Sequence, residues 1–354
     1  MRVHFVLAQL EPLYGMERAA VLLMRALQEQ GVEVSATVLS RSIPPGLDDL
    51  TVDTLGLGTR ITRLLEAVPP LRRRLRNLPA DVRIVASGLW ASLPAGAALA
   101  GSGRRFVGWE HSLLPERLRF DRRVRTLARL ARTNGLRPQL VVAVSDGVAR
   151  TVRQLAPGQS VLTIPNVLPP KPFVPPREVA DRERITLVTA GAFRPIKNHV
   201  GALEALALLP AHYHLTLAGD GAERELLHER ASALGLAGRT TFLGRVPQVA
   251  GLLAEADVLL HPSRAETFGF SLLEAAEAGL PVAALPVPAV DEMIPTFVPG
   301  ILARDTSPAA LADAVVRLTG DQRPTVTDFE KAWHNRRAAL DPAEVGRRWV
   351  EALR

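Results

Sequence analysis

Two glutamates in the C-terminal half of the chain have the type and spacing to bind hydroxyl groups. Glu266 and Glu274 are eight residues apart in the segment ADVLLHPSRAETFGFSLLEAAEAGLP, residues 256–281. An ionised carboxylate accepts hydrogen bonds, so the pair can hold two different sets of hydroxyls. The spacing alone is a weak signal, because a surface loop glutamate and a solvated helix glutamate would also produce it.

The same segment has the pattern of a strand, a loop and a helix. It predicts a buried strand at 258–260, a loop at 261–268 and a helix at 271–278, followed by Gly279 and Pro281. The helix would begin in Gly269-Phe270-Ser271, where backbone N–H groups have no partner inside the helix. Such an end attracts anions, so a phosphate or an electron-rich sugar oxygen would fit there.

Short apolar runs alternate with amphipathic segments in both halves of the chain. In the first half, strands are predicted at 3–7, 34–38, 84–86, 106–109 and 140–144, and a helix at 16–29. In the second half, strands are predicted at 185–190, 213–218, 240–243, 258–260 and 282–284, and helices near 198–208, 222–234, 247–255 and 271–278. This alternation favours an α/β chain with parallel sheets covered on both faces.

A proline-rich run separates the two halves. Five prolines stand in the nine residues 168–176, which cannot join the interior of a sheet and form a stiff linker instead. We therefore expect an N-terminal Rossmann-like domain at 1–170, a linker at 171–184 and a second such domain at 185–335. Ligands of these sheets bind at the carboxyl ends of the strands, so a cleft between the two facing sheets is the expected site.

Composition sets further limits. The chain has 354 residues, of which 47% are hydrophobic and 22% charged, as in ordinary two-domain globular proteins. No apolar run approaches the roughly 18 residues needed to span a bilayer, and the N-terminus reads directly as a strand. Because there is no cysteine, disulfides, thiolate nucleophiles and cysteine-bound zinc are excluded, which suits a cytoplasmic protein.

The net charge of +7 is unevenly distributed, with 24 basic and 13 acidic residues in 1–175 and 19 basic and 23 acidic residues after it. Arginines interleaved with leucine and valine gather at 71–76 and 117–137. The pattern fits either peripheral attachment to the anionic inner face of a membrane or an ordinary amphipathic surface helix. Nucleic acid is not an expected partner, since no recognised binding module is present and aromatic residues make up only 5%.

The segment 256–281 closely resembles the donor motif of the family 4 retaining glycosyltransferases, which have the GT-B fold. The resemblance extends over nearly the whole chain, through Tyr14-Gly15-Met16-Glu17-Arg18, Gly108-Trp109-Glu110-His111, Val144-Ser145-Asp146, Ile164-Pro165-Asn166, Leu217-Ala218-Gly219-Asp220-Gly221 and Phe242-Leu243-Gly244-Arg245-Val246. It implies a nucleotide-diphosphate sugar, UDP- or GDP-linked, as the donor and a hydroxyl of a glycan, a lipid-linked molecule or a natural product as the acceptor. It also implies that residues 336–354 form a helix that crosses back to the N-terminal domain.

The resemblance also implies roles for individual residues. Glu266 would bind hydroxyls of the donor sugar, Glu274 those of the ribose, and Gly15 would let a turn approach the diphosphate. The implied catalytic residues are Glu266, His111 and Lys197. The implied donor-binding residues are Gly15, Arg194, Lys197, Arg245, Val246, Glu266, Thr267, Phe268, Gly269, Phe270 and Glu274.

Two positions depart from the family pattern. Ala192 stands where the family usually has an arginine after the first strand of the donor domain, although Lys197 is kept. Arg194 is a candidate replacement for that arginine, and a solvated loop charge is the alternative. Tyr14 replaces the first glycine of the first-domain turn, which puts the usual phosphate geometry in doubt.

By the resemblance, transfer needs no metal and no other cofactor. The sequence agrees, because it contains no D-x-D motif, the usual carboxylate pair that holds a nucleotide-bound cation. Lys197, Arg194 and the helix N-terminus after Phe268 would stabilise the departing diphosphate instead. Retention is attributed in this family to front-face attack, and His111 would orient the sugar or the acceptor. His261 is expected to be a packed core residue.

Two other functions fit parts of the pattern. A GT-B protein that has lost catalysis, and binds only a nucleotide or a membrane, would explain Ala192 and Tyr14, while Glu266, Lys197 and Glu274 argue against it. A dehydrogenase would also have paired Rossmann-like sheets. However, no G-x-G-x-x-G motif follows the first strand of either domain.

Overall fold

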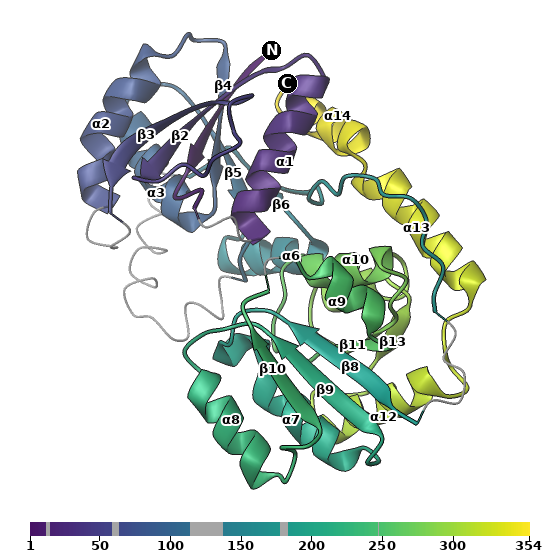
Figure 1. Cartoon of the computed structure of the whole chain (residues 1–354). Coiled ribbons are helices and arrows are strands. Elements are labelled where there is room, and N and C mark those ends of the chain that lie inside the picture. Colours follow the sequence, from purple (N-terminus) through teal and green to yellow (C-terminus); the bar gives the residue numbers. More distant parts are fainter. Residues whose placement is uncertain (12–14, 59–63, 114–136, 178–182, 247) are drawn as a thin grey trace. The chain divides into compact units, whose positions relative to one another are not determined.

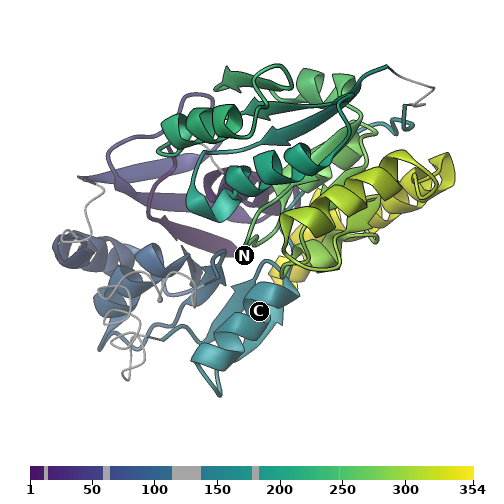
Figure 2. The ribbon, with the colours of Figure 1, turned by 90° about the horizontal axis from the view of Figure 1, so that it is seen from below.

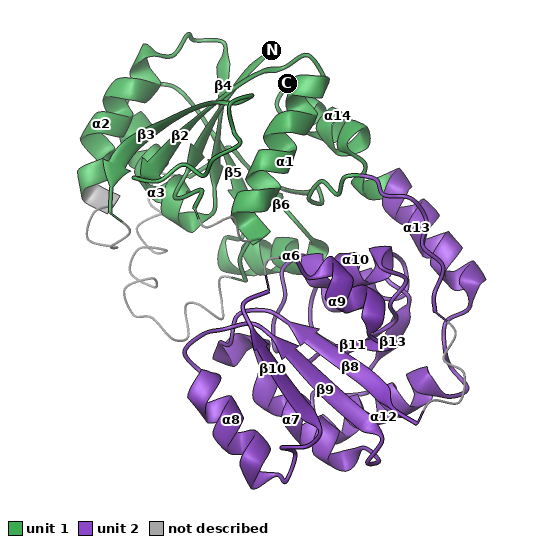
Figure 3. Ribbon diagram, in the orientation of Figure 1, with its two compact units in different colours: residues 1–169, 339–354 green, residues 170–338 purple. Residues whose placement is uncertain are grey.

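The computed structural model describes residues 1–11, 15–58, 64–113, 137–177, 183–246 and 248–354. The chain divides into two compact units (Figure 3). Unit 1 comprises residues 1–169 and 339–354, and unit 2 comprises residues 170–338. The proline-rich segment from Pro170 onward is therefore part of unit 2, and the last residues of the chain belong to unit 1.

Unit 1 contains a parallel sheet of seven described strands, in the order β3-β2-β1-β4-β5-β6-β7 (Figure 1). Its strands are β1 (Arg2–Leu7), β2 (Glu33–Ser40), β3 (Thr51–Leu57), β4 (Val82–Ser87), β5 (Val107–Glu110), β6 (Leu140–Ala143) and β7 (Val161–Thr163). Its helices are α1 (Gly15–Glu29), α2 (Leu64–Asn77), α3 (Leu89–Leu99), α6 (Asp146–Leu155) and α14 (Pro342–Ala352). The sequence prediction missed β3 and β7 and found the other strands to within two residues at each end.

The two faces of this sheet are covered by different helices. Helices α2 and α3 pack against each other on one face, over a core that includes Val6, Leu71 and Ile84. Helix α14 lies beside α1 (Figure 1). Trp349 of α14 reaches the buried Trp109 of β5, with ring centroids 5.4 Å apart. The C-terminal helix is thus anchored in the core of unit 1.

Unit 2 repeats the architecture with six described strands, in the order β10-β9-β8-β11-β12-β13 (Figure 1). Figure 2 shows the same ribbon from below. Its strands are β8 (Ile185–Ala190), β9 (Tyr213–Ala218), β10 (Thr240–Gly244), β11 (Val258–His261), β12 (Val282–Ala284) and β13 (Gly300–Leu302). Its helices are η2 (Pro195–Lys197), α7 (His199–Leu208), α8 (Arg224–Ala233), α9 (Ala250–Glu255), α10 (Phe270–Glu277), α11 (Val290–Met293), α12 (Pro308–Thr319) and α13 (Val326–Leu340), whose last two residues belong to unit 1. The prediction missed β13, and β11 extends one residue further than expected, to His261.

Side-chain caps fix several helix starts. The hydroxyl of Ser145 accepts a hydrogen bond from the Val148 N–H at 3.3 Å, and that of Ser307 accepts one from the Ala310 N–H at 3.2 Å. At the start of α14, the Asp341 carboxylate accepts from the Ala343 N–H at 2.9 Å. These caps satisfy backbone donors that the first helical turn leaves without partners.

The arginines of the first basic stretch, residues 71–76, differ in their contacts. Arg72 donates to the backbone oxygens of Ala97 and Ala98 at 2.8 and 3.2 Å and so caps the end of α3, and Arg74 forms an ion pair with Asp53. Arg73 and Arg76 are exposed. Residues 117–136 of the second basic stretch lie outside the described residues. No helix in the described ranges is both long and apolar enough to cross a membrane.

Candidate active site

The sheet of unit 2 has a point at which the chain changes direction. From β8 the chain moves outward through β9 and β10, and then returns to the other side of β8 as β11. In open parallel sheets, the loops leaving the carboxyl ends of the two strands at such a point diverge and leave a crevice for ligands. The loops at 191–198 and 262–269 follow β8 and β11, so they are the two loops at this position.

Two hydrogen bonds tie these loops together. The Arg264 N–H donates to the Ile196 oxygen at 2.9 Å, and the Asn198 side-chain amide donates to the Pro262 oxygen at 3.0 Å. Asn198 has a left-handed backbone, with φ of 54°, a conformation that asparagine tolerates better than most residues. The two loops therefore form one braced structure.

Lys197 and Glu266, both predicted site residues, are in direct contact across these loops. The Nζ atom of Lys197 lies 2.7 Å from Oε2 of Glu266, whose side chain is only 13% exposed. The other carboxylate oxygen, Oε1, accepts a hydrogen bond from the Thr267 N–H at 3.0 Å. Burial by itself raises the pKa of Glu266, but the positive charge and hydrogen bond of Lys197 outweigh it and bring the pKa to about 2. The carboxylate is therefore ionised at neutral pH.

His261 is a site neighbour that the sequence interpretation assigned to the core. It is buried, as expected, but its Nε2 atom lies 3.8 Å from Oε2 of Glu266. Burial lowers the pKa of His261 to about 4, so the ring is neutral at neutral pH. The signal that could have found it is its position, because it is the last residue of β11 and lies at the ligand-binding edge.

Helix α10 begins at the same edge. Gly269, the residue before it, has φ of 79°, which suits glycine, and a Cβ there would lie 2.8 Å from Cδ1 of Leu272. Phe268 is buried and its ring meets that of Phe270 at 5.0 Å. Glu274 is half-buried and lies four residues after Phe270, one turn into the helix. The structure thus puts the helix N-terminus directly after the loop that carries Glu266.

Three further predicted residues lie on loops at this edge. Arg194 is exposed and directly precedes η2, and its backbone N–H donates to the Ala192 oxygen at 2.8 Å. Arg245 and Val246 follow β10, where the Gly219 N–H donates to the Gly244 oxygen at 2.8 Å. The loops after β8, β9, β10 and β11 consequently converge on one edge of the sheet.

Glycines permit that convergence. A Cβ on Gly219 would lie 1.9 Å from the Gly191 oxygen, and one on Gly221 would lie 2.5 Å from the Phe193 oxygen. Both distances are far below van der Waals contact, so the loop after β9 could not approach the loop after β8 with larger residues.

The corresponding edge of unit 1 is only partly described. Gly15 is the first residue of α1, and Tyr14 lies outside the described residues. The Gln9 side-chain amide donates to the buried Glu17 carboxylate at 2.9 Å, and a Cβ on Gly88 would lie 3.4 Å from Sδ of Met16. The start of α1 thus lies beside the end of β4.

His111 follows β5 at that edge, one residue beyond the strand. Its ring lies against the Trp109 ring, with centroids 4.2 Å apart, and its backbone N–H donates to Oε1 of Glu110 at 3.0 Å. Burial lowers the pKa of His111 to about 3, so the imidazole is neutral at neutral pH. Its Nε2 atom is buried and has no hydrogen-bond partner among the described residues.

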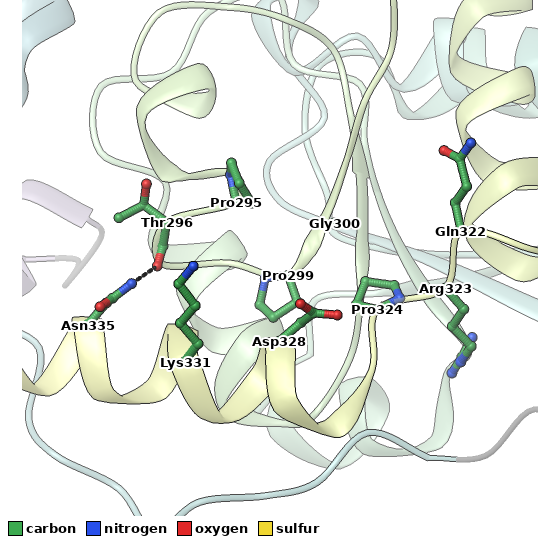
Figure 4. A pocket seen from close by; sticks show the side chains of 10 residues that line it. All are labelled: Pro295, Thr296, Pro299, Gly300, Gln322, Arg323, Pro324, Asp328, Lys331 and Asn335. Atoms are coloured by element: carbon green, nitrogen blue, oxygen red, sulfur yellow. Dashed lines mark hydrogen bonds between the residues drawn. The ribbon is translucent and has the colours of Figure 1, made fainter.

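A cavity of about 450 Å³ lies elsewhere in unit 2, at the amino end of β13 (Figure 4). It is lined by Pro295, Thr296, Pro299, Gly300, Gln322, Arg323, Pro324, Asp328, Lys331 and Asn335. The described residues that line it include none of the predicted site residues. Within the same described ranges, no group of three or more His, Asp or Glu side chains is arranged to hold a metal ion.

Comparison with known proteins identifies the class of this fold and site. The model of the glycosyl transferases group 1 matches residues 171–336, and that of glycosyltransferase family 4 matches residues 14–171. The structure of HepE from Anabaena in complex with UDP and glucose is similar to this chain, with a TM-score of 0.80 over 100% of this chain and 99% of HepE. The two sequences are only 20% identical, so this similarity shows the fold alone. The fold is the GT-B fold of glycosyltransferases.

Sequence relatives make the assignment more specific. The 2-deoxystreptamine N-acetyl-D-glucosaminyltransferase of Streptomyces fradiae is 30% identical over 96% of this chain and 89% of its own length. A GDP-mannose-dependent alpha-(1-6)-phosphatidylinositol dimannoside mannosyltransferase of Mycobacterium tuberculosis is 33% identical over 58% of this chain and 53% of its own. The chain belongs to the family 4 glycosyltransferases and is a glycosyltransferase.

Proposed function

We propose that this enzyme moves a sugar from a UDP- or GDP-linked sugar to an acceptor hydroxyl, with retention of the anomeric configuration and without a metal. The observation that carries the proposal is the Lys197–Glu266 pair, 2.7 Å apart, at the crevice between β8 and β11 and directly before α10. A cation and a carboxylate so placed match the two ends of a donor, its diphosphate and its sugar.

The diphosphate is the group that must accept charge when the sugar leaves. Lys197 supplies a full positive charge, the N-terminus of α10 supplies backbone dipoles, and Arg194 adds a flexible charge from the exposed loop. Preorganised positive groups stabilise the leaving group most when water is excluded. Gly15 in unit 1 would let the start of α1 come close to the diphosphate.

The two glutamates bind hydroxyls in this proposal. Glu266 is ionised, because its pKa is about 2, and it accepts hydrogen bonds from the donor sugar. Glu274 accepts from the ribose hydroxyls, one turn into α10. Arg245 and Val246 follow β10, where their backbone would meet the base. Thr267, Phe268, Gly269 and Phe270 form the stretch from the loop to the helix, whose N–H groups would face the sugar and the phosphate.

Retention follows from front-face attack. The acceptor hydroxyl attacks the anomeric carbon on the face from which the diphosphate departs, and the leaving phosphate oxygen takes the hydroxyl proton. No side chain of the enzyme then has to act as a nucleophile. His111 is neutral above its pKa of about 3, so it orients the sugar or the acceptor by hydrogen bonding rather than by charge.

The relatives support a nucleotide-sugar donor but differ in acceptor. The Streptomyces fradiae relative is named for 2-deoxystreptamine, and the Mycobacterium tuberculosis relative for a phosphatidylinositol dimannoside. A lipid-linked acceptor would bring unit 1 to an anionic membrane surface, where the exposed Arg73 and Arg76 could contribute. Transfer assays with 2-deoxystreptamine and with vesicle-borne phosphatidylinositol mannosides distinguish the two acceptor classes.

The test of the proposal is thermal stabilisation by a panel of nucleotides in the presence of EDTA. UDP or GDP should raise the melting temperature, because a ligand that binds only the folded state stabilises it. Glu274→Ala should abolish the shift, whereas Glu229→Ala, an exposed position on α8, should keep it. No shift with any nucleoside diphosphate, or a shift that requires added metal, would contradict the proposal, and a shift with NAD(P) alone would indicate a dehydrogenase.

A further inference from the structure

Glu266 has two potential partners on one of its oxygens. Oε2 lies 2.7 Å from Nζ of Lys197 and 3.8 Å from Nε2 of His261, while Oε1 is held by the Thr267 N–H. Lys197 is within hydrogen-bond distance and His261 is not. In this state the lysine holds the carboxylate and the histidine lies just beyond reach.

The Nε2 atom of His261 is buried and makes no hydrogen bond in this state of the described residues. A buried polar atom without a hydrogen-bond partner is energetically unfavourable. We therefore expect Nε2 of His261 to gain a partner in another state of the site. The charged and titratable groups that face the ring are Glu266, Lys197 and His199. Of these, the Glu266 carboxylate is the negatively charged acceptor, with Oε2 at 3.8 Å from Nε2 of His261.

Donor binding changes the demands on Lys197. In the proposed function the ammonium group of Lys197 binds the diphosphate, so its contact with Oε2 of Glu266 is weakened or lost. The carboxylate then needs another donor to keep its orientation toward the sugar hydroxyls. A shift of about 1 Å would bring His261 from 3.8 Å to a normal N–H···O distance.

We propose that His261 is a positioning residue that hydrogen-bonds Glu266 through Nε2–H when Lys197 turns to the donor diphosphate. This exchange of partners couples binding of the diphosphate to binding of the sugar. The diphosphate binds Lys197, and His261 keeps the Glu266 carboxylate oriented toward the sugar hydroxyls. The neutral ring suits this role, since burial lowers its pKa to about 4 and one ring nitrogen then donates while the other accepts. The inference rests on the proposed function.

Two variants of similar shape test this role. Glutamine can place its side-chain N–H close to the position of Nε2, whereas methionine fills a similar volume and has no N–H to donate. The measurement is the ratio of dissociation constants for UDP and UDP-glucose, or for GDP and GDP-mannose if the enzyme prefers guanosine, in wild type, His261→Gln and His261→Met. The ratio isolates the sugar contribution, which a purely structural role of His261 would not change selectively.

In His261→Met we expect the sugar contribution to affinity to fall about tenfold, as for loss of a hydrogen bond to a charged group. Binding of the nucleoside diphosphate alone should change less than about twofold, and His261→Gln should stay within about threefold of wild type. Equal ratios in Gln and Met variants, or equal losses for nucleotide and nucleotide sugar, would overturn the inference while leaving the proposed function standing. If the wild type bound no nucleotide sugar, the proposed function would fail and this inference with it.

Discussion

The ligand-binding edges of the two sheets share a plan and differ in their side chains. In unit 1 the chain reverses direction between β1 and β4, and in unit 2 between β8 and β11. The edge of unit 2 carries an opposed pair of charges, Lys197 and Glu266, on two loops that are hydrogen-bonded to each other. The edge of unit 1 carries the neutral His111, whose Nε2 has no partner among the described residues.

In the proposed function, this difference lets one architecture serve two tasks. The strands supply the same crevice in both units, and the chemistry comes from the few residues that follow each strand. A diphosphate requires fixed positive charge, which unit 2 provides. We propose that the acceptor hydroxyl needs an uncharged hydrogen-bonding group, and His111, which follows β5 in unit 1, is such a group.

Removing the positive charge at the edge of unit 2 should have the largest effect. Lys197→Met is expected to lower kcat by about 10²–10³, because one preorganised donor to the leaving group is lost. Steady-state kinetics with the preferred nucleotide sugar provides the measurement. Lys331→Met, at an exposed position on α13, is the matched control and should leave kcat within about twofold. Equal losses in both variants would mean that Lys197 has no special role.

Adding a methyl group where the loops of unit 2 approach each other most closely should have the second largest effect, a loss of stability. In Gly219→Ala the new Cβ would lie 1.9 Å from the Gly191 oxygen, so we expect a loss of about 3 kcal/mol in the free energy of unfolding. Gly88→Ala at the edge of unit 1 meets only Sδ of Met16 at 3.4 Å and should cost about 1–2 kcal/mol, because φ of 70° with ψ of 171° is a backbone conformation that suits glycine. Denaturant titration measures both values, and a larger cost at Gly88 would reverse the comparison.

The neutral histidine of unit 1 should affect transfer without affecting the donor. His111→Ala is expected to lower the rate of transfer at least about tenfold, while the dissociation constant of the nucleoside diphosphate stays unchanged. Rates of transfer and calorimetric nucleotide titrations measure the two quantities. His212→Ala removes an exposed histidine and serves as the control. A weakened nucleotide affinity in His111→Ala would contradict the division of tasks between the two edges.

Acid should weaken both units, and at lower pH unit 2 should weaken further. Burial lowers the pKa of His4 and His111 in unit 1 to about 4 and about 3, and the pKa of His199 and His261 in unit 2 to about 4. The unfolded chain therefore binds more protons than the folded chain between pH 6.5 and 4. The contribution of these histidines to the free energy of unfolding is therefore fully present above pH 6.5 and is lost as the pH falls toward 4. Each histidine lowers the free energy of unfolding by at most about 1.4 kcal/mol for each pH unit. Glu266, with its pKa of about 2, adds a loss in unit 2 as the pH falls from about 4.5 to 2.

Thermal unfolding across this pH range tests the effect. His4→Gln should flatten the dependence between pH 6.5 and 4, because glutamine does not titrate and can still reach Ser35 or Thr37, the partners of His4 at 2.8 and 2.9 Å. His212→Gln, at an exposed position, is the control substitution. An unchanged slope in His4→Gln would mean that this histidine is protonated in the folded state.

The fold was predictable wherever a strand is buried. Strand β8 is largely buried and was found to the residue from its apolar run. Strand β3 lies at the edge of its sheet and is mostly exposed, with Asp53 and Gly56 in its sequence, so it lacks the apolar signal. Strand β13 has only three residues, begins with Gly300 and is half-buried, so it has no clear apolar run. Strand β12 is equally short, but it is fully buried and was found to the residue.

For the candidate site, the sequence named candidate residues but did not predict their contacts. The resemblance to the family implied Lys197 and Glu266 as site residues, and the strand order shows that their loops are neighbours. His261 was missed because a buried histidine beside a strand has the same sequence signature whether it packs in a core or faces a carboxylate. The difference lies in its 3.8 Å approach to Glu266, which depends on the path of the loop after β11.

The central claim is that the Lys197–Glu266 pair is the donor site, and donor cleavage tests it most directly. The measurement is release of UDP or GDP from a panel of nucleotide sugars, with EDTA present, by wild type and by Glu266→Gln. The account predicts release by the wild type from at least one donor, and a rate at least about a hundredfold lower in Glu266→Gln. Release that is unaffected by Glu266→Gln would contradict the assignment of the site, and no release by the wild type from any donor would contradict the proposed activity.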